Sequence, residues 1–180
     1  MAADLPWEKI TFTFGDERCV PPTDEQSNYR MANQTLFTPA HVPETSVLRM
    51  RGEIEPSLAA EEYEQQLATL AKQRSESVYE HDLILLGMGD DGHTASLFPG
   101  TAALNEKTRG VVANFVPKLN AWRLTMTIPL IAAARQICFL VNANKQPELL
   151  DQVLSGDLRY PAAQIAAQAK NVTWILGETG

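Results

Sequence analysis

Residues 82–100 have the sequence DLILLGMGDDGHTASLFPG, and this stretch decides the class of fold. The run DLILL is continuously apolar after its first residue and is cut short by Gly87, which is typical of a strand buried on both faces of a parallel sheet. Glycines and aspartates follow at once and predict a sharp turn, after which we expect a helix to begin near Thr94. A buried strand, a polar turn and a helix in succession indicate an α/β protein.

The rest of the chain continues this alternation. Apolar runs predict further strands at residues 9–14, 110–115, 124–128, 136–141 and 172–176. Helical patterns predict helices at residues 27–37, 57–75, 129–135 and 161–169, and one more that ends at residue 154. We therefore expect one α/β domain over residues 1–180, with a mostly parallel sheet and helices on both faces.

Composition excludes several classes of partner. The 180 residues have a formal net charge of −7 and a pI of about 5.0, and without a basic tract nucleic acid is not an expected partner. No apolar run approaches the roughly 18 residues that span a bilayer, and residues 1–9 lack the apolar core of a signal peptide, so no membrane partner is expected. Cys19 and Cys138 are expected to stay reduced, as in a cytoplasmic protein.

Three polar clusters directly follow predicted strands. They are GDER at residues 15–18, GMGDDGHT at 87–94 and NANK at 142–145. In a parallel sheet all three would lie at the same edge, where α/β proteins place their active sites. Together they supply carboxylates, a histidine, two cations and a glycine-rich turn, so we expect a functional site there.

His93 is the expected catalytic residue, because imidazole can take a proton from water near neutral pH and return it. The alternative is a histidine that caps the helix expected at Thr94. Asp91 is expected either to orient His93 or only to stabilise its turn. Asp16 is expected to hold sugar hydroxyls or act as a base, with a solvated turn residue as the alternative. Glu17 is expected to point away from it and serve structure only.

Local cations must bind any phosphate, because the protein as a whole is acidic. Arg18 and Lys145 are the expected cations, and Lys145 precedes an expected helix whose free amides also favour an anion. Arg123 and Arg135 are further candidates for the same role. For each of these residues a solvated surface charge is the alternative.

The turn at residues 87–92 satisfies G-x-G-x-x-G, so a dinucleotide site has to be considered. Two consecutive aspartates would repel a pyrophosphate, and the next expected strand ends without an acid to bind ribose. We instead expect Gly87, Gly89 and Gly92 to let the backbone approach a substrate. The chain has no P-loop motif, no G-x-S-x-G and no Cys or His pair at metal-ligand spacing, so neither a cofactor nor a metal is expected.

With these motifs in view, the sequence resembles the 6-phosphogluconolactonases. The matching segments are GDERCVPPTDEQSNYRMA (15–32), DLILLGMGDDGHTASLFPG (82–100), RLTMTIPLIAAARQICFLV (123–141), NK (144–145), PAAQIA and VTWIL. The resemblance covers nearly the whole chain, and GMGDDGHTASLFPG is highly specific. It implies a Rossmann-like fold shared with glucosamine-6-phosphate deaminases and ribose-5-phosphate isomerases.

The same resemblance implies an activity. This is hydrolysis of 6-phospho-D-glucono-1,5-lactone to 6-phosphogluconate in the oxidative pentose phosphate pathway, without a metal. His93 would be the general base, Asp16 and Arg18 would be the aspartate and arginine of the DER motif, and Lys145 would lie near the phosphate. Amides of the turn at residues 87–92 would stabilise the oxyanion.

The sequence departs from the family pattern at its start. The family begins with a strand, a helix and a glycine-rich phosphate loop, and residues 1–7 resemble only the end of that helix. An N-terminally truncated fold with an exposed sheet edge is therefore expected, and such an edge predicts either instability or self-association. Two alternatives stay open. One is a glucosamine-6-phosphate deaminase, whose family prefers a tyrosine in place of Arg18 and an acid shortly after the histidine; the other is a sugar-phosphate-binding module without catalysis.

Overall fold

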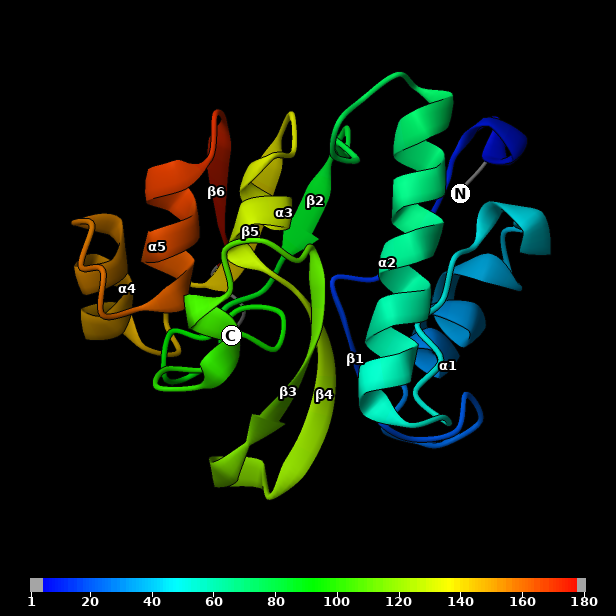
Figure 1. The fold of residues 1–180 in the computed structure, drawn as a ribbon. Coiled ribbons are helices and arrows are strands. Elements are labelled where there is room, and N and C mark those ends of the chain that lie inside the picture. Colours follow the sequence, from blue (N-terminus) through cyan, green and yellow to red (C-terminus); the bar gives the residue numbers. More distant parts are fainter. Residues whose placement is uncertain (1–4, 178–180) are drawn as a thin grey trace.

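The computed structural model describes residues 5–177 (Figure 1). Its strands are β1 (Asp16–Arg18), β2 (Ile84–Leu86), β3 (Val111–Val116), β4 (Ala121–Met126), β5 (Ile137–Asn142) and β6 (Val172–Gly177). Its α-helices are α1 (Asn28–Ala32), α2 (Pro56–Gln73), α3 (Ile128–Ala132), α4 (Pro147–Leu154) and α5 (Pro161–Gln168). The short turn η5 (Pro117–Leu119) joins β3 to β4.

The described strands form two sheets of three. In one sheet β5 lies between β2 and β6, and all pairs are parallel. In the other, β4 lies between β1 and β3, and all pairs are antiparallel. The expected α/β class is confirmed. The antiparallel sheet is a difference in detail, because β3 and β4 are joined by a short turn, and a short connection permits only antiparallel pairing.

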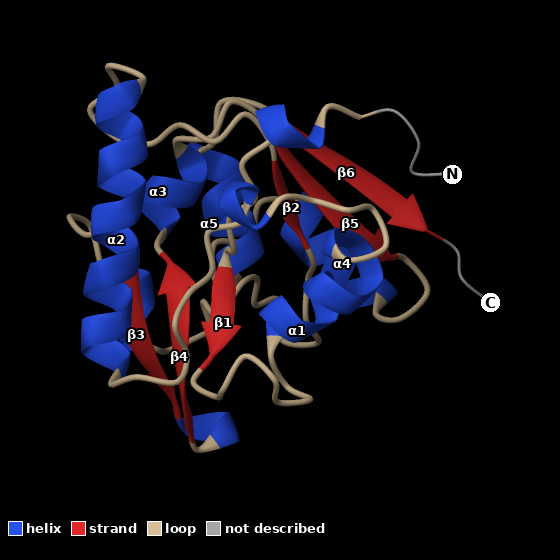
Figure 2. Ribbon diagram, turned by 90° about the vertical axis from the view of Figure 1, so that its right-hand side faces the viewer, coloured by secondary structure: helices blue, strands red, loops and turns tan. Residues whose placement is uncertain are grey.

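The two sheets differ in what covers them. Figures 1 and 2 show α2 beside β3 and β4, against which it packs, while α4 and α5 lie with the parallel sheet. One face of the parallel sheet is open in the described part of the chain, where Leu85, Leu140 and Ile175 are 59%, 48% and 51% exposed. β2 is therefore buried on one face and not, as expected, on both. Of the helices within residues 5–177, none combines the length and the apolar character needed to cross a bilayer.

Helix α2 confirms the helix expected at residues 57–75. Pro56 occupies its first turn, where a missing N–H costs no hydrogen bond. Tyr63 and Leu67 recur on one face at helical spacing and are 1% and 3% exposed. The Tyr63 hydroxyl also accepts a hydrogen bond from the amide of Phe14 at 2.8 Å, so the helix fixes the segment that leads into β1.

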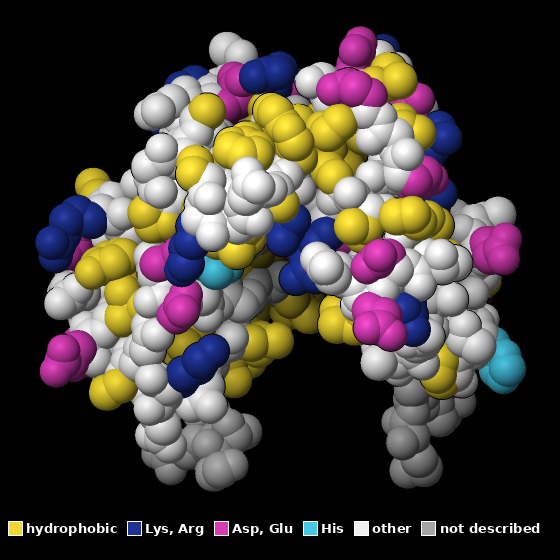
Figure 3. Space-filling model, turned by 90° about the horizontal axis from the view of Figure 1, so that it is seen from below, with side chains coloured by type: hydrophobic (Ala, Val, Ile, Leu, Met, Phe, Trp, Pro, Cys, Tyr) yellow, Lys and Arg dark blue, Asp and Glu magenta, His cyan; other side chains and the backbone are white. Residues whose placement is uncertain are grey.

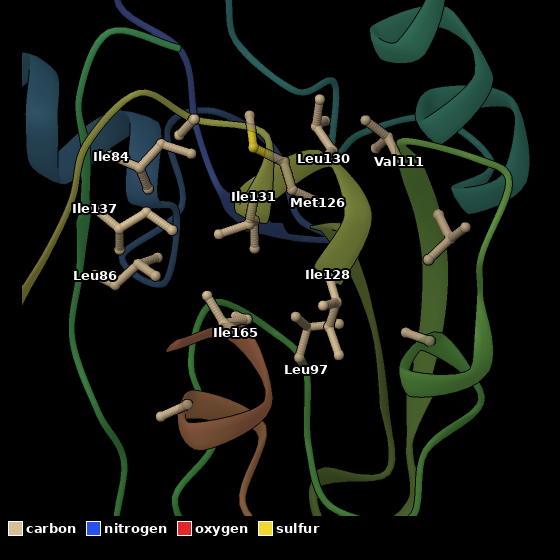
Figure 4. Close-up of a cluster of buried hydrophobic side chains, with 14 of the residues drawn as sticks. Ile84, Leu86, Leu97, Val111, Met126, Ile128, Leu130, Ile131, Ile137 and Ile165 are labelled. Carbon is tan, nitrogen blue, oxygen red and sulfur yellow. The ribbon is translucent and has the colours of Figure 1, made fainter. Parts of the chain in front are cut away.

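A cluster of buried apolar side chains joins the two sheets (Figure 4). Ile84 of β2 and Ile137 of β5 lie on one side of this cluster, and Met126 of β4 faces them. Ile128 and Ile131 of α3 are fully buried beside them. Each such side chain stabilises the fold by about 1.5–3 kcal/mol, so the short α3 holds the two sheets in a fixed relation.

Two expected elements differ from the structure. Residues 9–14 form no strand of either sheet, and Phe12 makes one isolated bridge. No helix begins at Thr94. Instead the amide of Leu97 donates to the carbonyl of Thr94 at 3.0 Å in a turn, and Ala95 has a φ of 48°. Left-handed backbone at Ala95 cannot continue into a right-handed helix.

Candidate active site

The glycine-rich turn after β2 sets the position of His93. The Gly89 amide donates to the His93 carbonyl at 2.9 Å, so the chain folds back on itself. A β carbon on Gly89 would lie 2.0 Å from Cε1 of the imidazole, so only glycine lets the ring lie there. The Phe98 ring stacks on the imidazole with a centroid distance of 4.0 Å. The imidazole is thus held between backbone and an aromatic ring, with 25% of its side chain exposed.

Asp91 holds the edge of this ring. Its Oδ1 lies 2.6 Å from His93 Nδ1 and also accepts from the His93 amide at 3.2 Å. A carboxylate at Nδ1 keeps the proton on that nitrogen and leaves the lone pair of Nε2 free, the form that a general base needs. Burial acts to raise the pKa of Asp91, but hydrogen bonds from His93 and Lys118 outweigh it and hold this pKa below its usual value. The contact between Asp91 Oδ1 and His93 Nδ1 is the one that Asp91 needs in order to orient His93.

Asp16 comes from the other sheet and meets the same loop. Ser96, in the turn after His93, donates its hydroxyl to Asp16 Oδ2 at 2.6 Å, and the side-chain amide of Asn28 donates to Oδ1 at 3.2 Å. Burial raises the pKa of Asp16 by more than the Ser96 hydrogen bond and the charge of Arg18 lower it. The first two polar clusters therefore adjoin, although β1 is antiparallel, because the turn after His93 packs on β1.

Arg18 and Arg123 form a pair of neighbouring cations. They lie opposite each other in the register of β1 and β4. Arg18 donates to the carbonyl of Gln26, and Arg123 donates to that of Trp122 at 3.1 Å. Burial, followed by the charge of Arg18, lowers the pKa of Arg123. Within residues 5–177 neither guanidinium has a carboxylate within 4.0 Å, and two cations in this state favour an anion between them.

Glu17 points away from Asp16 and caps α1. It is 2% exposed, and its oxygens accept from the amides of Asn28 and Tyr29 at 2.7 and 2.8 Å. A carboxylate at a helix N-terminus balances the positive end of the helix dipole. The expected structural role of Glu17 is confirmed. Ser27 is the N-cap of α1, as predicted, because its side chain accepts from the backbone at the start of the helix.

Lys145 and Arg135 lie at opposite ends of β5. Lys145 is exposed beyond the carboxyl end of β5, two residues before α4, at the same edge as the glycine-rich turn that follows the parallel β2. Arg135 lies before the start of β5, where its guanidinium pairs with Asp82 at 3.0 Å and Glu76 at 3.4 Å. The structure therefore does not bring Arg135 to the site expected for it, because carboxylates at the opposite edge hold it.

The three glycines of the turn differ in their surroundings. Gly92 has a φ of 74°, and a β carbon there would meet the ring of Tyr160 at 2.6 Å. A β carbon on Gly87 would meet nothing within 4 Å. The amides of Gly89 and Gly92 donate to carbonyls inside the loop. The expected oxyanion donors are thus partly committed, whereas the Met88 amide has no backbone acceptor within residues 5–177.

A further cation, Lys118, reaches this turn from the β3–β4 connection. Its Nζ lies 3.0 Å from Asp91 Oδ2 and 3.4 Å from Asp90 Oδ1. In the described part of the chain, Asp90, Asp91 and His93 have ligand atoms within 4.8 Å of one another, a spacing that suits a metal ion. Asp91 and His93 already bond to each other, and the ammonium balances both carboxylates.

Figure 3 shows Lys and Arg side chains beside a histidine where the surface is hollowed between two lobes.

Three residues near His93 were not predicted from the sequence. Ser96 and Phe98 belong to the same TASLF segment, and a hydroxyl inside an apolar stretch is the signal by which Ser96 could have been found. Lys118 has no motif of its own and is far away in the sequence, so only the folded chain shows its contact.

An oriented histidine, two carboxylates and a pair of arginines are typical of an enzyme that activates water against an anionic substrate. Comparison of the whole chain with known proteins shows which family has this arrangement. The chain belongs to the family described as glucosamine-6-phosphate isomerases/6-phosphogluconolactonase, whose model matches residues 1–174. The family expected from the motifs is thereby confirmed.

Individual relatives support the same family assignment. The 6-phosphogluconolactonase of Haemophilus influenzae is 34% identical over 178 residues, which are 97% of this chain and 74% of the relative. That of Synechocystis is 39% identical and covers 97% and 73%. The crystal structure of 6-phosphogluconolactonase from Thermotoga maritima has a TM-score of 0.82 at 28% identity, covering 97% of this chain and 76% of that one. The fold is therefore that of these enzymes.

Proposed function

We propose that this chain hydrolyses 6-phospho-D-glucono-1,5-lactone to 6-phosphogluconate in the oxidative pentose phosphate pathway. The relatives described above are 6-phosphogluconolactonases, which are carboxylic ester hydrolases. One observation carries the assignment of the base: the 2.6 Å contact between Asp91 Oδ1 and His93 Nδ1. It leaves His93 Nε2 able to take a proton from water. The reaction consumes only the lactone and water, so no redox or group-carrying cofactor takes part.

The mechanism follows from this contact. His93 Nε2 takes a proton from water as the water oxygen attacks the lactone carbonyl carbon. Negative charge gathers on the carbonyl oxygen, and the Met88 amide is a candidate donor for it. The bond from this carbon to the ring oxygen then breaks, and His93 returns its proton to that oxygen, which becomes a hydroxyl. The new carboxylic acid ionises and releases a proton. General base catalysis contributes about 10²–10⁴-fold.

Binding of the phosphate is assigned to cations near this centre. Arg18 and Arg123 are free of carboxylate partners within residues 5–177, and each can donate two hydrogen bonds to a phosphate. Lys145 supplies a further charge from the end of β5. Asp16 is held by Ser96 and takes the sugar hydroxyls. A substrate fixed through its phosphate reacts faster because the water and carbonyl are positioned in advance.

Glucosamine-6-phosphate deamination is the alternative within the family. Residues 94–99, which follow the histidine, contain no acid that could orient it. Here Asp91, which precedes the histidine in the sequence, makes that contact, and this argues against deamination. A sugar-phosphate-binding module without catalysis is the second alternative. It would bind 6-phosphogluconate but leave the lactone unchanged, so turnover separates it from a hydrolase.

The test is proton release from freshly generated lactone at neutral pH. It compares the wild type, His93→Ala, His41→Asn and buffer alone. His41 is exposed and has a φ of 54°, which asparagine tolerates, so it is the matched control. We expect the wild type and His41→Asn to accelerate hydrolysis, and His93→Ala to lose about 10²–10⁴-fold. Equal rates for the wild type and His93→Ala would refute the role of His93. No acceleration by folded wild type, with binding of 6-phosphogluconate, would favour the binding module.

A second copy of this chain is the proposed partner of the open sheet edge. Among the described residues β2 is an edge strand, and Leu85 and Leu140 are exposed on the open face. Beside β2 lies a cavity of about 720 Å³ lined in part by residues 9–13 and 82–85. His81 in its wall is 6% exposed, and neither ring nitrogen has a hydrogen-bond partner within residues 5–177. Unpaired edges and open faces of parallel sheets favour pairing with another chain.

Light scattering over a concentration series tests this association. We expect a mass above the 19.9 kDa of one chain that rises with concentration. Leu85→Lys combined with Leu140→Lys should return the mass to one chain. Leu158→Lys is the control, since Leu158 is equally exposed but lies between α4 and α5. A wild type that stays at one chain's mass throughout would contradict the proposal.

We also propose that the protein is located in the cytoplasm and that residues 1–180 form a single domain. Cys19 and Cys138 are free thiols, as is usual in a reducing compartment. The cluster that joins the two sheets argues for one folding unit. Cell fractionation and a single unfolding transition in urea are the respective measurements.

A further inference from the structure

Lys118 reaches the catalytic turn from a distant part of the sequence. It lies in η5, between β3 and β4, and its Nζ is 3.0 Å from Asp91 Oδ2. The other oxygen of Asp91 lies 2.6 Å from His93 Nδ1. The two oxygens of one carboxylate are therefore divided between an ammonium and an imidazole.

This division makes the geometry of Asp91 depend on Lys118. The Asp91 side chain is 27% exposed and belongs to a turn, so packing alone does not fix it. Within residues 5–177, Lys118 is the partner of Oδ2, while both other contacts of the carboxylate use Oδ1. A carboxylate held at only one oxygen turns more freely about its last torsion, which is broad in aspartate.

Charge gives Lys118 a second effect on the same turn. Asp90 and Asp91 are adjacent carboxylates, and Lys118 Nζ lies 3.4 Å from Asp90 Oδ1 as well. Without a cation they would repel each other and an anionic substrate. The ammonium balances this charge through its contacts with the two carboxylates, and within residues 5–177 it has no hydrogen bond to His93.

We propose that Lys118 is a positioning residue for the lactone hydrolysis. Its ammonium holds Asp91 in the orientation in which Oδ1 keeps the proton on His93 Nδ1, so that Nε2 is the nitrogen that takes the proton from water. The inference rests on the proposed role of His93 as general base. Lys118 does not itself contact the reacting atoms.

Two variants and one control test this role. Lys118→Met keeps most of the apolar stem and removes the charge, and Lys118→Arg restores a cation. Lys107→Met makes the same change in net charge at an exposed lysine whose ammonium has no ion pair within residues 5–177. We expect kcat of Lys118→Met to fall about two- to fivefold, as for loss of a partly exposed ion pair, with KM unchanged. Lys118→Arg should recover kcat, and Lys107→Met should match the wild type.

Nitrogen-15 NMR of the histidine side chains gives a second readout without substrate. The wild type should show His93 mainly protonated on Nδ1, and this fraction should fall in Lys118→Met. A rise in KM at constant kcat would overturn the inference, since Lys118 would then bind substrate. Agreement of Lys118→Met with Lys107→Met in both kcat and NMR would overturn it as well. Absence of turnover by the wild type would refute the proposed function, and the NMR comparison would still decide whether Lys118 sets the tautomer.

Discussion

A β carbon on Gly89 would lie 2.0 Å from Cε1 of His93 and 2.2 Å from Nδ1, so the imidazole occupies space that only glycine leaves free. Gly89→Ala should push the ring away from Asp91 and break the 2.6 Å contact that orients it. A displacement of about 1 Å costs on the order of 10²-fold in rate, so kcat should fall by about that factor. Steady-state proton release measures the loss, and circular dichroism checks that the fold is kept.

Gly87→Ala is the comparison for this variant. A β carbon on Gly87 meets nothing within 4 Å, so His93 should keep its place and most of the activity should remain. An equal loss in both variants would show that crowding of the ring is not the cause. The glycines would then act through close approach of the backbone to the substrate.

The arginine pair predicts a selective loss of substrate affinity. Arg18→Ala and Arg123→Ala should each raise KM, by roughly 10- to 100-fold, because a hydrogen bond to a charged group contributes about 1.5–3 kcal/mol. Arg135→Ala is the matched control, since Arg135 pairs with Asp82 at the far end of β5 and should leave KM unchanged. KM values and inhibition by inorganic phosphate are the measurements. A larger effect of Arg135→Ala than of Arg18→Ala would contradict the assignment.

Substitution of Glu17 is expected to lower the stability of the fold. It is buried and accepts from the amides of Asn28 and Tyr29. Glu17→Gln removes the charge and places an amide donor against these donors, which should lower the free energy of unfolding by about 1–3 kcal/mol. Urea unfolding measures this change. Glu25→Gln, at an exposed position nearby, should change it by less than about 0.5 kcal/mol, and an equal effect of both would argue against the capping role.

His81 predicts a dependence of stability on pH. Burial, followed by the charge of Arg74, lowers its pKa from 6.5 to about 4. The unfolded chain therefore binds a proton on this residue between about pH 6.5 and 4 that the folded protein does not bind, so stability falls as pH falls through this window. Between pH 7 and 5 the loss from this residue should be about 2 kcal/mol.

Urea unfolding at pH 7, 6 and 5 checks this dependence. His81→Leu should reduce the slope of stability against pH, because it removes the buried base. His41→Asn, at an exposed position, is the control for replacing a histidine outside the core. A slope that is unchanged in His81→Leu would show that other groups govern stability in this range.

The sequence by itself determined the elements and the chemistry that depend on neighbouring residues. The apolar run before Gly87 specified β2, the spacing of Tyr63 and Leu67 specified α2, and the motif around His93 identified the family. Each of these signals lies within one turn, one strand or one helix. Local sterics and periodicity decide such features, so they can be predicted without knowing what packs against them.

Only the tertiary structure decided which distant side chains meet. Ser96 reaches Asp16 because the turn after His93 packs on β1, and Lys118 reaches Asp91 because the β3–β4 connection brings its ammonium to 3.0 Å from Oδ2. The sequence does not show which carboxylate a charged residue will pair with. For this reason Arg135 was a candidate for the phosphate site, although in the structure it pairs with Asp82 at the other end of β5. The packing of the core that joins the two sheets fixes these distances, and ion pairs and hydrogen bonds form only where that packing brings their partners within reach.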